Sequence, residues 1–375
     1  MKILYIFILI LNCIIFYPDT LWAAWKGVRG DFNVGMQVEY DDNVTSTVDA
    51  NKKSDLINEL TLGVVFGQEG KTQSWNIKGD LIQSLFTNNT LLNNLSQYLK
   101  GNYKKEISKY DRLNVTNVFT RAESISRFED SFGENIEPFR YFRNRFNAQY
   151  ERDLAKRFAM KADYMNEIYE TERTTSADSI LNKYTLELDY IKASDLFFLM
   201  EYGLTTRHYS TGEDTNLHDF LSGGRYYFTS VFYMDIRAGV SLVKTFDNQN
   251  LIEPKYRVMF IQNTNESTQI SFTYQKDNSA GSARREVFDS WRISGNLYHQ
   301  VLQRLAVNST IFYGEGQYNS SGLGDTLSGG RVQLNYDIRE KANLTLAYRY
   351  AKTDSTQDSR DSVRNVVTLG LTVKF

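Results

Sequence analysis

The sequence predicts an all-β protein, namely a transmembrane antiparallel up-and-down β-barrel of about 18 strands, with about 16 as the next choice. Three observations lead to this fold class. Apolar and polar residues alternate along most of the chain, long and short connections follow one another, and the chain stops on an aromatic, Phe375. Alternation gives each strand one apolar and one polar face, which suits a closed barrel with lipid outside and a wet lumen.

The alternating segments follow one another from the start of the barrel to its end. The opening segment, 31–40, has Phe32, Val34 and Met36 on one face and Asn33 and Gln37 on the other. The closing segment, 367–375, repeats this pattern. Segments 98–105 and 113–121 alternate more weakly, which keeps the smaller strand number open. The remaining strands are expected at 56–66, 74–85, 142–150, 158–168, 184–190, 196–208, 220–228, 232–242, 256–262, 270–274, 291–297, 305–313, 332–338 and 344–350.

The connections predict which ends of the strands share a side of the membrane. Segments 67–72, 108–111, 151–156 and 193–195 are short, whereas polar segments such as 41–55, 87–96, 123–138, 170–179 and 353–362 are longer. Short turns on the periplasmic side and longer loops outside are typical of outer-membrane barrels. If both termini are periplasmic, the strand number must be even. A loop that folds inward, such as 123–138, would narrow the pore.

The first 23 residues are expected to be a signal peptide, followed by a barrel domain over 24–375. Lys2 precedes an apolar run that ends near Pro18, and this run is shorter than the roughly 20 residues that a membrane-spanning helix needs. Cys13, the only cysteine, lies within the apolar run. These features predict secretion to the cell outer membrane of a Gram-negative bacterium.

The overall composition excludes some classes and leaves others open. A formal net charge of −2 and the lack of a basic tail argue against nucleic-acid binding. The mean hydropathy of −0.45 suits a soluble protein and a barrel equally, because half of each transmembrane strand faces water. The 25 tyrosines and 23 phenylalanines favour strands and membrane interfaces. Pro138 and Pro254 are expected at strand edges, where a missing N–H is tolerated.

Charged residues and tyrosines alternate onto the predicted inner face. This set could select a polar solute, or it could be a set of ion pairs that fills the wall. Its mixed signs argue against a strong preference for simple anions or cations. The pore-lining candidates are Arg143, Arg145, Glu187, Asp189, Glu201, Arg225, Tyr233, Asp235, Arg237, Arg257, Arg292, Arg331, Asp337 and Arg349.

Catalysis has little support in the sequence, and we expect no enzyme, no catalytic residue, no metal and no cofactor. His208, His218 and His299 are the only histidines, and their separation does not suggest a zinc site. A hydrolase built from His208, Ser210 and Asp214 remains a remote alternative, because a triad is recognised by geometry.

Short motifs near both ends resemble the putative β-barrel porin 2 family. They are Val38-Glu39-Tyr40-Asp41-Asp42-Asn43-Val44, Lys53-Ser54-Asp55-Leu56-Ile57 and Leu60-Thr61-Leu62-Gly63, while Leu369-Gly370-Leu371-Thr372-Val373-Lys374-Phe375 resembles the C-terminal recognition segment of outer-membrane barrels. The resemblance implies a channel-like barrel, often associated with export of exopolysaccharide or capsule, and no catalytic residue. The partners it implies are outer-membrane lipid, the barrel assembly machinery and polysaccharide export components. Phe375 would be the signal that the assembly machinery recognises. The oligomeric state stays open.

Three functions therefore remain to be distinguished. The first is a porin-like channel for a polar solute, such as a secreted polysaccharide. The second is a closed barrel that serves as a surface scaffold or adhesin, and the third is the outer-membrane hydrolase.

Overall fold

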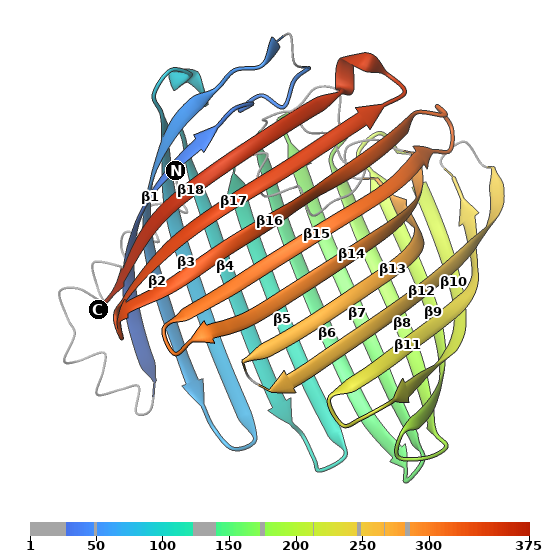
Figure 1. Cartoon of the computed structure of the whole chain (residues 1–375). Coiled ribbons are helices and arrows are strands. Elements are labelled where there is room, and N and C mark those ends of the chain that lie inside the picture. Colours follow the sequence, from blue (N-terminus) through green and yellow to red (C-terminus); the bar gives the residue numbers. More distant parts are fainter. Residues whose placement is uncertain are drawn as a thin grey trace.

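A computed structural model shows one closed barrel of 18 antiparallel strands (Figure 1). It describes residues 28–48, 51–122, 140–172, 177–212, 214–245, 249–265, 267–281 and 286–375. The predicted fold class and the larger of the two strand numbers are thus confirmed. The strands are β1 (Arg29–Asp41), β2 (Asp55–Glu69), β3 (Gln73–Phe86), β4 (Asn94–Glu106), β5 (Asp111–Ala122), β6 (Tyr141–Ala155), β7 (Phe158–Thr171), β8 (Ser179–Ile191), β9 (Leu196–Tyr209), β10 (Asp214–Tyr227), β11 (Phe232–Lys244), β12 (Asn250–Asn265), β13 (Thr268–Ala280), β14 (Val287–Leu302), β15 (Leu305–Tyr318), β16 (Gly324–Arg339), β17 (Ala342–Ser355) and β18 (Ser362–Lys374).

Each strand pairs with the next in the sequence, and the first pairs with the last. In the closing pair, Val38 of β1 lies opposite Leu369 of β18. The backbone N–H of Phe375 continues the ladder and donates to the carbonyl of Phe32 at 2.8 Å. This closure satisfies the edge groups of the sheet, as a bilayer requires.

Several strands extend beyond the alternating segments on the side of the longer connections. β12, for example, begins at Asn250, whereas alternation begins only at 256. These extensions shorten loops that the sequence predicted to be longer, and two short 3₁₀ helices, Thr90–Leu92 and Asp358–Arg360, lie in such loops. Pro254 lies in a part of β12 that pairs with β11 but not with β13. The pairing of β12 with β13 begins at Tyr256. The missing N–H of Pro254 therefore costs the ladder no bond on the β13 side.

The outer face carries two rows of aromatic side chains. One lies near the short turns, where the rings of Phe158 and Tyr190 are 5.1 Å apart and those of Phe228 and Phe232 are 4.8 Å apart. A second row lies further along the strands and includes Tyr184, whose ring lies 5.0 Å from that of Tyr164. Exposed aliphatic residues, such as Met200 at 65% exposure, lie between the rows. Aromatic rings beside an exposed apolar band are typical of barrels that span an outer membrane.

The expected signal peptide, 1–23, and the expected inward-folding loop, 123–138, both fall outside the described residues. They remain predictions, as does Pro138. In the described part of the chain no helix is long and apolar enough to cross a membrane, a criterion that applies to helices alone.

Candidate functional site

The pairing register places one face of every strand inside the barrel. On β11, Ile236 and Val240 are 40% exposed and point outward, so the alternate residues Asp235 and Arg237 point inward and are almost fully buried. Strand neighbours preserve this parity, because residues paired across a sheet share a face. All the pore-lining candidates fall on the inward face by this rule. Their role in a pore stays a prediction.

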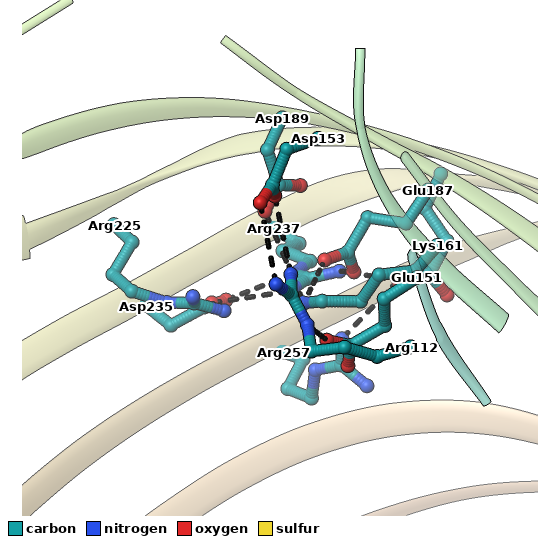
Figure 2. A network of polar contacts seen from close by, with 11 residues as sticks. Arg112, Glu151, Asp153, Lys161, Glu187, Asp189, Arg225, Asp235, Arg237 and Arg257 are labelled. Atoms are coloured by element: carbon teal, nitrogen blue, oxygen red, sulfur yellow. Dashed lines mark hydrogen bonds and ion pairs between the residues drawn. The ribbon is translucent and has the colours of Figure 1, made fainter. Parts of the chain in front are cut away.

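Near the short turns, Arg237 joins acidic residues from three strands (Figure 2). Its guanidinium contacts Glu187 of β8, Glu201 of β9 at 2.5 Å and Asp235 of β11 at 2.9 Å. The side chain is only 4% exposed. A guanidinium has five donors in a fixed fork, which explains how one residue can bind several carboxylates.

Further cations complete this Arg237 network. Lys161 of β7 binds Glu187 at 2.8 Å and lies 3.9 Å from Asp189. Arg225 of β10 binds Asp235 at 2.8 Å and lies over the ring of Tyr233, and Arg257 of β12 binds Glu201 at 3.3 Å. The network therefore contains four basic residues (Lys161, Arg225, Arg237, Arg257) and four acidic residues (Glu187, Asp189, Glu201, Asp235), and its formal charge is zero.

The ion pairs of the network run along the wall. Its members come from the consecutive strands β7 to β12, and Glu187 and Arg237 are three strands apart. Figure 2 also draws Arg112, Glu151 and Asp153, which form a separate, more exposed cluster on β5 and β6.

A second cluster lies on the side of the longer connections. Glu167 of β7 binds Arg143 at 2.8 Å and Arg145 at 2.6 Å, both of β6, and Arg207 of β9 at 3.0 Å. Glu167 is 3% and Arg207 4% exposed, whereas Arg145 is 44% exposed. Three guanidiniums therefore share one carboxylate.

This cluster forms part of a cavity of about 310 Å³, which we call the loop-side cavity. The cavity is lined by residues of β6 to β10 and β12 to β15 and by Gly281. Its acidic residues are Glu167, Asp219 and Asp277, and its basic residues are Arg143, Arg145, Lys183, Arg207, Lys255 and Arg292. Asp219 and Asp277 both bind Lys255, at 2.9 and 2.5 Å. Among the described residues that line the cavity, six are basic and three are acidic.

A hydrogen bond between two distant strands lies at one edge of the loop-side cavity. The hydroxyl of Tyr209, at the end of β9, donates to the carbonyl of Gly281, just after β13, at 2.8 Å. Nearby, Leu217, Val243, Ala280 and Val287 form a small buried apolar cluster. Gly281 therefore lies against the end of β9.

The other predicted candidates lie apart from these two groups. Arg331 of β16 and Arg349 of β17 are direct register partners, and Asp337 accepts a hydrogen bond from Asn343 at 2.9 Å. Among the candidates, Arg292 lies with Arg143 and Arg145 at the loop-side cavity.

Several residues of these clusters are absent from the predicted set. Lys161, Glu167 and Arg207 lie in predicted strands and have the inward parity, so alternation alone could have identified them. Asp219 and Lys255 each lie one residue before a predicted segment and share its inward parity, so extending each segment by one residue would have identified them.

Two of the residues considered for a hydrolase, His208 and Asp214, lie close together on the outer face. Nδ1 of His208 lies 2.8 Å from Asp214, and both side chains are about half exposed. No hydrogen bond joins Ser210 to His208 among the described residues. Within the same residues, no group of three or more His, Cys, Asp or Glu side chains could hold a metal ion.

Comparisons with known proteins agree with this architecture. Residues 263–375 match the family model of the putative beta-barrel porin 2 family, which confirms the resemblance over this range. It includes the C-terminal motif but not the motifs near Val38 and Leu60. No curated protein matches the sequence.

Among solved structures, a mutant of the ferric enterobactin receptor PfeA from Pseudomonas aeruginosa, in complex with enterobactin, has a TM-score of 0.51. It is 7% identical, and the match covers 92% of this chain and 81% of that one. Pseudomonas aeruginosa OpdK with vanillate has a TM-score of 0.49 at 9% identity, with 92% of this chain and 99% of that chain covered. Acinetobacter baumannii OccAB3 has a TM-score of 0.47 at 10% identity, with 94% and 100% covered.

The chain is thus a porin-like β-barrel of the kind found in Gram-negative outer membranes. This rests on the closed 18-strand fold, the matched family range and the similarity to PfeA, which at such low identity bears on the fold alone.

Proposed function

We propose that this protein is a channel in the Gram-negative outer membrane that lets a polar solute pass, and that the solute is a secreted polysaccharide. The observation that carries the proposal is a closed barrel whose inward ion pairs run along the wall. Barrels of 16 to 18 strands are wide enough to leave an aqueous channel.

The width follows from the strand number. A round barrel of 18 strands, spaced ~4.8 Å apart and tilted by about 40°, has a backbone radius of about 18 Å. Two opposing arginine side chains cannot meet across that distance. Ion pairs between near neighbours therefore brace the wall and leave the centre to water, unless loops fill it.

The polysaccharide part rests on the resemblance to the putative beta-barrel porin 2 family, which implies export systems as partners. Guanidinium forks and tyrosine rings on the inner face suit saccharide hydroxyls and carboxylates. The barrel assembly machinery and polysaccharide export components are the partners we propose.

The surface-scaffold alternative draws support from the neutral Arg237 network, which could serve stability alone. Conductance of the purified protein in planar lipid bilayers separates the two functions. A channel gives discrete conductance steps, and vesicles that contain it swell in solutions of small saccharides. Folding of the protein is first verified by its heat-dependent gel mobility. If the folded protein then gives neither conductance steps nor vesicle swelling, the scaffold function is favoured.

A further inference from the structure

We infer that a patch of apolar and aromatic side chains on the inner wall, near the short turns, binds the ring faces of a saccharide chain. The inference says how the proposed channel would hold its solute, and so it rests on the proposed function. We call this group the inner aromatic patch. Its members come from five consecutive strands: Ile191 of β8, Phe197 of β9, Tyr227 of β10, Tyr233 of β11 and Ile261 of β12.

The inward direction of the patch follows from strand parity. Each member lies an even number of positions from a charged residue of the Arg237 network in its own strand, as Tyr233 does from Asp235. Since side chains alternate between the two faces of a strand, the patch shares the inner face with this network. Its three rings are partly exposed on that face.

The patch differs from the inner wall that continues it. In the pairing register Ile261 lies opposite Ser271, Ser271 opposite Asn296, and Asn296 opposite Thr310, so the same row continues through polar residues on β13, β14 and β15. Thr310 donates to Asn296 at 3.0 Å. A wet lumen favours polar side chains of this kind. A contiguous run of apolar ones therefore indicates a surface that a solute covers.

The rings of the patch form a continuous surface with hydrogen-bonding groups beside it. The ring centroids of Phe197 and Tyr227 are 5.6 Å apart, and those of Tyr227 and Tyr233 are 5.0 Å apart. Arg225 lies 5.7 Å from the ring centroid of Tyr233 and binds Asp235 through Nε and Nη2. Within the part of the chain that the structure describes, no hydrogen bond engages Nη1 of Arg225 or the hydroxyls of Tyr227 and Tyr233. These groups can therefore donate to a solute that lies on the rings.

A saccharide is the solute that fits this combination. A sugar ring has a C–H face that packs on an aromatic ring, and hydroxyls around its edge that accept from a tyrosine hydroxyl or a guanidinium. A wholly apolar solute would leave those donors unpaired, and a simple ion would leave the rings uncovered. Binding sites for organic molecules likewise combine aromatic surface with a few polar groups. Because short turns are typical of the periplasmic side, the patch lies where a secreted chain would enter the channel.

The test compares removal of the rings with removal of their hydroxyls. The double variant Tyr227→Leu and Tyr233→Leu loses both rings, whereas Tyr227→Phe with Tyr233→Phe keeps them. Tyr298→Leu is the matched control. Tyr298 also has inward parity near the short turns, but it lies opposite Gln269 and Asn308 and contacts no other ring among the described residues.

Folding of each full-length variant is verified by heat-dependent gel mobility. The probes are maltohexaose and cellohexaose, two glucose chains of different linkage, and polyethylene glycol of equal mass is the size control. One readout is the residence time of each probe in single channels in planar bilayers. The other is calorimetric binding of the same probes to the purified protein.

We expect at least one of the glucose chains to bind and to interrupt the current, and polyethylene glycol to do neither. The leucine double variant should shorten the residence time and weaken binding about tenfold, the usual effect of losing two aromatic contacts. The phenylalanine double variant should bind more tightly than the leucine one because it keeps the rings, and Tyr298→Leu should bind as the wild type does.

Other outcomes overturn either the site or the channel. If a conducting protein binds neither glucose chain, if the two double variants lose equally, or if Tyr298→Leu loses as much as they do, the site is overturned and the channel stands. Calorimetric binding of a glucose chain, weakened by the leucine double variant but without any conductance, would support the site and overturn the channel.

Discussion

Replacing Arg237 by methionine should destabilise the barrel far more than the same replacement at Arg112. Arg237 is 4% exposed and contacts three carboxylates on three strands. Removing one partner of a buried ion pair typically costs 3–5 kcal/mol, because a charge is left without compensation. Methionine restores the apolar stem of the side chain but none of its donors.

The expected loss lies at the lower end of that range because each carboxylate keeps a second cation. Glu187 keeps Lys161 at 2.8 Å, Asp235 keeps Arg225 at 2.8 Å, and Glu201 keeps Arg257 at 3.3 Å. We therefore expect the free energy of unfolding to fall by about 3 kcal/mol, which is roughly a 150-fold change in the folding equilibrium constant.

Arg112→Met is the matched control. Arg112 also binds two carboxylates, Glu151 at 3.2 Å and Asp153 at 3.1 Å, but it is 44% exposed. Exposed pairs contribute about 0–1 kcal/mol because water screens them. Unfolding by guanidinium chloride in phospholipid vesicles, followed by tryptophan fluorescence, measures both variants. Equal losses, or a loss below about 1 kcal/mol for Arg237→Met, would refute the assignment of this network as a brace of the wall.

Three further predictions use other parts of the chain. Gly239→Ala should lower the free energy of unfolding by about 1–3 kcal/mol, because an added Cβ would lie 1.7 Å from the carbonyl oxygen of Phe220. Gly101→Ala is the control: an added Cβ there has no heavy atom within 4 Å, so the free energy of unfolding should not change in the same titration. Deletion of Phe375 should lower the yield of folded barrel, scored by heat-dependent gel mobility, more than it alters conductance, and an unchanged yield would contradict its role in assembly. His208→Ala should leave conductance and folding unchanged, and loss of an esterase activity in that variant would instead revive the hydrolase.

The number of strands could be predicted from the sequence because alternation is a local property. A residue's face depends on its parity within its own strand, and this holds wherever lipid selects one apolar face. The same rule assigned Asp235 and Arg237 to the inner face before any pairing was known. Alternation fails where strands rise beyond the apolar band, since both faces are then polar. Lys255 and Asp219 each directly precede a predicted segment, so its parity assigns them to the inner face, but parity alone does not place them in the loop-side cavity.

The partners of the inward residues could not be predicted for a different reason. Glu187 and Arg237 are three strands apart, as the order of β8 to β11 shows, and only the curvature of the wall brings their side chains together. Sequence separation and parity contain no information on that curvature.

The arrangement of the inward charges along the barrel could likewise not be predicted from a tally of their signs. Mixed signs summed over the whole wall hide their segregation along the barrel axis. Near the short turns every acidic residue of the Arg237 network is matched by a basic one, whereas Glu167 faces three arginines near the longer loops. A solute responds to the local field of the section it occupies. The two groups of ion pairs therefore differ in composition as well as in position, and the local field of each follows from its own residues.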